Sequence, residues 1–127
     1  MALDYGSART GVAVSDPTGT VARPLGVVER AGAESGLAEL ARLAREEKVE
    51  RMVVGLPLTM RGAHGEQAAE TERFVEALRG ALGVPVELYD ERFTTDLAQQ
   101  TAGSAPEDAL AAAHLLSTYL EWCAARS

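Results

Sequence analysis

Three acidic positions along the chain have the residue type and placement for metal-dependent chemistry, and Asp4 is the first of them. It follows Ala2 and Leu3, which we expect to lie in a buried strand. A carboxylate at the end of such a strand costs free energy unless it is paired or holds a cation. Gly6 has no side chain, so the backbone beside the acid can let a phosphate or a metal approach closely. Asp4 is therefore the first candidate site residue.

The second acid follows a predicted strand over residues 86–89, and the third begins the last predicted helix. Glu91 is the preferred acid after the strand, and Asp90 stays an alternative. On the last helix, Glu107 has a capping role, because Ser104 and Glu107 have the spacing of a capping box. Asp108 is the freer ligand candidate, on the side of the helix expected to face the sheet.

Clustered carboxylates on separate elements are the oxygen ligands that Mg²⁺ or Mn²⁺ prefers. Two such ions about 3.5–4 Å apart can activate a water and stabilise the leaving oxygen of a phosphodiester. Without a cation, the acids would raise one another's pKa values and destabilise the fold. Basic side chains in or beside the same loops could contact phosphates: Arg9, Arg61 and Arg92. The pattern predicts a two-metal phosphodiesterase site.

Each of these residues also has a plainer interpretation. Asp4 could be satisfied by backbone amides, and Glu91 could pair with Arg92 on the surface. Asp108 could act only on the helix dipole, and each arginine could be solvated. The two histidines and Cys123 are expected to have no chemical role.

The elements that must position these acids are read from apolar runs, periodicity and turn signals. Two strands joined by a tight turn are expected within residues 1–16, and residues 20–23 are expected to continue the second strand. Further strands are expected at residues 24–29, 51–56 and 86–89. Helices are expected at 35–47, with Ser35 as N-cap, at 66–82, closed by Gly83, at 94–100, and at 104–125, with Ala111, Leu115, Tyr119 and Trp122 on its apolar face.

This order predicts an α/β fold with a five-stranded mixed sheet, in which a three-strand antiparallel meander is followed by parallel strands, with helices on both faces. Sites in such sheets lie at the carboxyl ends of the parallel strands. Asp4, residues 55–57 and residues 90–91 should therefore gather at one edge.

Composition limits the partners and the location. The chain has 127 residues, 46% of them hydrophobic, which suits one domain over residues 1–127. The net charge of −7 argues against nonspecific coating of nucleic acid or membranes. A single cysteine excludes an internal disulfide and a multi-cysteine zinc site. With no signal peptide or membrane span visible, we expect a cytoplasmic protein.

Four motifs in order resemble the YqgF/RuvX family: LDYGSARTGVAVSDP, VVGLPLTMRGAHG, DERFTT and EDALAAAHLLSTYL. The resemblance covers almost the whole chain and implies an RNase H-like fold. It implies a nuclease for 5′-end processing of pre-16S rRNA, or alternatively a Holliday junction resolvase. Asp4, Glu91 and Asp108 match the family's three acids. The partner would be structured nucleic acid, and the protein a monomer or a homodimer.

One segment departs from the family pattern. Only 12 residues separate Thr95 from Asp108, where the family has a longer basic segment. Fewer basic side chains are therefore available to bind a nucleic-acid substrate. This keeps open a noncatalytic nucleic-acid-binding module on the same fold. A nucleotide-binding phosphotransferase is a weaker alternative, because the turn after Asp4 resembles the phosphate loop of kinases that use two such domains.

Overall fold

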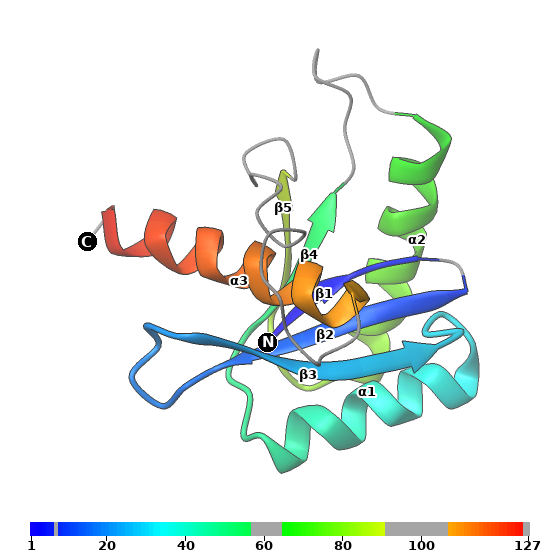
Figure 1. The fold of residues 1–127 in the computed structure, drawn as a ribbon. Coiled ribbons are helices and arrows are strands. Elements are labelled where there is room, and N and C mark those ends of the chain that lie inside the picture. Colours follow the sequence, from blue (N-terminus) through cyan, green and yellow to red (C-terminus); the bar gives the residue numbers. More distant parts are fainter. Residues whose placement is uncertain (7, 57–64, 91–106, 126–127) are drawn as a thin grey trace.

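A five-stranded sheet forms the centre of the computed structural model, which describes residues 1–6, 8–56, 65–90 and 107–125 (Figure 1). The strands are β1 (Ala2–Asp4), β2 (Arg9–Ser15), β3 (Ala22–Glu29), β4 (Met52–Leu56) and β5 (Val86–Asp90). The helices are α1 (Glu34–Glu46), α2 (Glu66–Ala81) and α3 (Glu107–Ala125). No helix in this part of the chain has the length and apolar character that a membrane crossing requires.

The strand order is β3-β2-β1-β4-β5. Strands β1, β2 and β3 are antiparallel neighbours, and β1, β4 and β5 run parallel. The predicted meander followed by parallel strands is thus confirmed. The expected helix over residues 94–100 and the Ser104 cap lie outside the described residues.

Helices cover both faces of the sheet, as predicted, and each face has its own apolar core (Figure 1). Because side chains alternate along a strand, Leu3 points to the face covered by α1 and α2, whereas Ala2 points to the face covered by α3. We call these the α1/α2 face and the α3 face. Leu40 of α1 and Leu78 of α2 are fully buried on the first, and Leu115 of α3 is buried on the second.

The second strand ends earlier than predicted. Residues 20–23 do not continue β2, because Ala22 and Arg23 already belong to β3 and pair back onto the end of β2. The Asp16 carboxylate closes the hairpin by accepting hydrogen bonds from the backbone N–H groups of Thr20 and Val21, at 2.9 and 3.1 Å. A side-chain-stabilised turn therefore replaces the expected strand extension.

Two helix ends also differ from expectation. The N-cap of α1 is Ala33, with extended backbone and no side-chain cap, so Ser35 lies inside the helix. Gly36 packs so tightly that an added Cβ would lie 2.2 Å from the Arg30 carbonyl oxygen, so a side chain at this position would force a shift. At the end of α2, Leu82 is extended and packs against the core, so Leu82 ends the helix before Gly83.

The buried stripe of α3 is rotated from the predicted one. Leu115 and Tyr119 are buried as expected, together with Ala109, Ala112 and Leu116. Trp122 is 43% exposed, although it still makes an edge contact with Tyr89.

Candidate active site

Asp4 lies at the carboxyl end of β1, where β4 and β5 also end. The register pairs Leu3 with Val54, so Gly55 is the next residue of β4 beside Asp4. Strand β4 in turn pairs with β5, and the last pair in this register is Leu56 with Asp90. The described parts of the three segments that were predicted to gather at this edge do so.

Glycines occupy the positions on either side of Asp4 in the sheet. On the antiparallel side, Gly11 of β2 is the direct partner of Asp4. On the parallel side, Gly55 follows in the register described above. With no side chain on either neighbour, the backbone of another element can approach the sheet closely beside Asp4.

The two acids at the ends of β1 and β5 belong to different faces. Asp4 shares the α3 face with Ala2, by the alternation of β1. On β5, Tyr89 packs in the core of the α3 face, whereas Leu88 packs against the core of the other face. Asp90 therefore points to the α1/α2 face. This placement counts against Asp90 as a partner of Asp4.

The first turn of α3 is pressed against β2 at Gly11. A Cβ on Gly11 would lie 1.8 Å from the Asp108 carbonyl oxygen and 3.0 Å from the Ala109 nitrogen, so only glycine allows this approach. Gly11 is also the cross-strand partner of Asp4. Two successive contacts, Asp4 to Gly11 and Gly11 to Asp108, thus bring two of the predicted acids to one face.

Sequence reasoning missed the role of Gly11. Its place in an apolar stretch gave it no role among the predicted site residues. A usable signal was present, because a glycine inside a strand often marks a close approach of another backbone.

Arg9 is at the rim of the same face, two residues before Gly11 on β2. Its Nε lies 3.3 Å from Oδ2 of Asp108, and the two side chains are 67% and 32% exposed. The sequence predicted a phosphate contact for this guanidinium. The structure shows that it pairs with Asp108, one of the predicted metal ligands.

Three predicted site residues lie outside the described part of the chain: Glu91, Arg61 and Arg92. Within residues 1–6, 8–56, 65–90 and 107–125, no group of three His, Cys, Asp or Glu residues is arranged to hold a metal ion. The predicted triad needs Glu91, so the described residues supply two of its three carboxylates.

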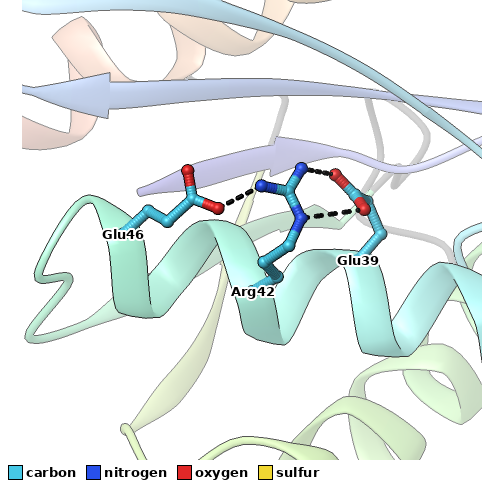
Figure 2. A network of polar contacts seen from close by, with 3 residues as sticks. All are labelled: Glu39, Arg42 and Glu46. Carbon is cyan, nitrogen blue, oxygen red and sulfur yellow. Dashed lines mark hydrogen bonds and ion pairs between the residues drawn. The ribbon is translucent and has the colours of Figure 1, made fainter.

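Ion pairs neutralise several arginines away from this edge. Arg42 on α1 lies between Glu39 and Glu46, as Figure 2 shows, and its Nε donates to Glu39 at 3.2 Å. The hydrogen bonds raise the pKa of Arg42 and lower that of Glu39. Since α1 covers the opposite face of the sheet, this group does not contribute to the candidate site.

A polar network anchors α3 to the sheet farther from the site. The Tyr119 hydroxyl donates to the Glu87 carboxylate and accepts a hydrogen bond from Arg51 at 3.1 Å. Burial, with a smaller effect of the Glu87 hydrogen bond, raises the pKa of Tyr119. The network joins α3 to β5 and to Arg51, just before β4, and so helps to fix the helix that carries Asp108.

The chain is similar to known proteins over almost its whole length. Residues 1–122 match the family described as RuvX: Holliday junction resolvase. The chain belongs to the RuvX family. A relative from Chloroflexus aggregans, named "Putative pre-16S rRNA nuclease", is 45% identical over 95% of this chain and 92% of its own. A relative of the same name from Syntrophomonas wolfei is 38% identical over the same shares.

Solved structures show the same fold. RuvC from T. thermophilus in complex with a Holliday junction substrate aligns with a TM-score of 0.59 at 20% identity, covering 94% of this chain and 92% of that one. A second T. thermophilus RuvC structure aligns with a TM-score of 0.54. The RNase H-like fold of this RuvX family member is thereby confirmed.

Proposed function

We propose that this chain is a metal-dependent endonuclease that hydrolyses phosphodiester bonds in structured nucleic acid. Its proposed role is 5′-end processing of pre-16S rRNA in the cytoplasm. The observation that carries the proposal is that Asp4 and the backbone of Asp108 lie on one face of the sheet, both next to Gly11. The name of relatives that are 38–45% identical over 95% of the chain supports the choice of RNA.

The residues at this edge fit a divalent cation. Asp4 and Asp108 provide hard oxygen donors from separate elements, as Mg²⁺ and Mn²⁺ prefer. Gly11, the cross-strand partner of Asp4, lets the first turn of α3 approach closely enough to bring Asp108 to the same face. Glu91 is the proposed third ligand, because Asp90 belongs to the other face. When bound, a pair of cations would supply an activated water and stabilise charge on the leaving oxygen.

The remaining roles belong to the protein. Strands β1 and β2 and the first turn of α3 hold the backbone of the two acids by close packing. Arg9 is exposed at the rim and is proposed to contact a phosphate, with Arg61 and Arg92 proposed for the same task. Because the protein carries a net charge of −7, such local cations must provide most of the attraction to nucleic acid.

A second candidate is resolution of four-way DNA junctions, which the description of the family favours. A resolvase cuts two strands symmetrically and would act as a stable homodimer, because two-fold symmetry places one site on each strand. An RNA-processing enzyme has no such need and could act as a monomer. A noncatalytic binding module is the third possibility.

One cleavage assay separates these functions. Wild type, Asp4→Asn and Asp90→Asn are incubated with Mn²⁺ or Mg²⁺ and either a four-way DNA junction or an RNA carrying the 5′ extension of pre-16S rRNA. The proposal expects cleavage of the RNA, loss of cleavage in Asp4→Asn and near-normal cleavage in Asp90→Asn, whose carboxylate lies on the other face. Cleavage of only the junction would favour the resolvase. Binding without any cleavage would favour the binding module.

A further inference from the structure

The Asp108 carboxylate has two competing uses. In the structure its Oδ2 accepts the Arg9 guanidinium at 3.3 Å. The proposed function, on which this inference rests, assigns the same carboxylate to a cation. A positive guanidinium beside the carboxylate opposes the approach of a second positive charge, since like charges repel.

Packing keeps this pair together while leaving it exchangeable. Gly11 lies two residues after Arg9, and its contact with the Asp108 carbonyl fixes the backbone of both partners. The side chains, in contrast, reach solvent, with Arg9 67% and Asp108 32% exposed. Ion pairs between exposed groups are weak, so a stronger partner for either group can displace the other.

A phosphodiester is such a partner for Arg9. Guanidinium groups bind phosphates through charge-assisted, often bidentate hydrogen bonds. A phosphate that takes over Arg9 would release the Asp108 carboxylate to the cation. Binding of nucleic acid and of metal would then favour each other, because a coupling between two ligands is reciprocal.

We propose that Arg9 is a positioning residue that couples nucleic-acid binding to metal binding, by exchanging the Asp108 carboxylate for a phosphate of the substrate. Unliganded protein would hold its cation weakly, and the substrate would complete the site. This restricts the hydrolytic centre to protein that is already bound to nucleic acid.

The first test is Mn²⁺ binding to the protein without nucleic acid. Binding is measured from the electron paramagnetic resonance signal of the free ion. Removing the competing charge in Arg9→Gln should tighten Mn²⁺ binding about three- to tenfold, the range expected for one weak ion pair plus one nearby like charge. Arg9→Lys keeps the charge and should remain closer to wild type. Arg23→Gln is the matched control. Arg23 forms an ion pair with Glu47 at 3.1 Å, away from the candidate site, and the exposure of these two side chains is similar to that of Arg9 and Asp108.

The second test is binding of the same RNA or junction without metal, measured by fluorescence anisotropy across a salt series. If Arg9 contacts one phosphate, Arg9→Gln should lower the slope of log K against log salt by about one, and Arg23→Gln should not. Adding Ca²⁺, which also prefers oxygen ligands, should strengthen nucleic-acid binding more in wild type than in Arg9→Gln.

The outcomes separate this inference from the proposed function. If Asp4→Asn and Asp108→Asn weaken Mn²⁺ binding but Arg9→Gln matches Arg23→Gln in both tests, the coupling is refuted and the metal site stands. If neither Asp4→Asn nor Asp108→Asn changes Mn²⁺ binding, the proposed metal site fails and the inference fails with it.

Discussion

Substituting alanine for Gly11 should separate the two acids without touching either of them. The added Cβ would lie 1.8 Å from the Asp108 carbonyl oxygen, and real Cβ atoms essentially never approach closer than 3.0 Å. The first turn of α3 must therefore move away from β2 by about 1.2 Å, the difference between these two distances. The obstacle is backbone, so no side-chain rotation relieves it.

The cost of Gly11→Ala can be estimated in two ways. Overpacking of this kind destabilises proteins by about 1–3 kcal/mol, which corresponds to a melting temperature lower by roughly 3–12 °C for a chain of this size. A displacement of about 1 Å in a catalytic constellation can lower the rate by about 100-fold. We therefore expect a large loss of cleavage activity and of Mn²⁺ affinity in a variant that loses only a few kcal/mol of folding stability.

Gly26→Ala is the matched control. Gly26 is the β3 partner of Val12, one residue from Gly11, and a Cβ there meets nothing within 4 Å. Thermal unfolding, Mn²⁺ binding and cleavage are measured for both variants beside wild type. The reasoning is refuted if Gly11→Ala keeps the melting temperature and the Mn²⁺ affinity of Gly26→Ala, because the close approach of α3 would then not position the site.

Three further predictions concern stability. Tyr119→Phe should lower the free energy of unfolding at pH 8 by about 1–2 kcal/mol, through the lost hydrogen bonds. The pKa of Tyr119 is raised in the fold, so the unfolded chain loses the phenol proton first, and the wild type should lose stability as the pH rises above about 10. Urea unfolding at pH 8, 10 and 11 should show a smaller loss of stability in Tyr119→Phe than in the wild type. An equal loss in both proteins would contradict the raised pKa of Tyr119. Gly80→Ala, at an open and exposed position in α2, should raise stability by about 0.5–1 kcal/mol, and destabilisation in the same assay would refute the open packing. Leu40→Ala, at a fully buried position on the α1/α2 face, should cost about 2–5 kcal/mol, and a loss below that range would mean that the core collapses around the gap.

Much of the fold follows from the sequence, because its signals are strong and agree. Continuous apolar runs mark the buried strands, and short connections restrict the order in which strands can pair. The expectation that Thr20 and Val21 continue the second strand was wrong, since their backbone N–H groups bond to the Asp16 carboxylate in a turn, a contact that strand patterns do not encode. Ser35 is a good capping residue in isolation, but the structure places Ala33 at the N-cap and Ser35 inside α1.

The candidate site was only partly predictable. The sequence proposed Asp4 and Asp108, and the strand topology places the backbone segments that carry them on one face of the sheet. The sequence left open whether Asp90 or Glu91 is the ligand, because it does not show to which face of the sheet Asp90 points. In the structure, Leu88 and Tyr89 pack in different cores, so Asp90 points to the α1/α2 face. The pairing of Arg9 with Asp108 is a contact between distant segments that no local pattern encodes.

Anomalous diffraction from crystals soaked in Mn²⁺ would test the central claim most directly. The account predicts a manganese peak on the α3 face of the sheet, within bonding distance of carboxylate oxygens of both Asp4 and Asp108. A manganese ion bound to Asp90 on the α1/α2 face, or bound without either Asp4 or Asp108, would contradict it.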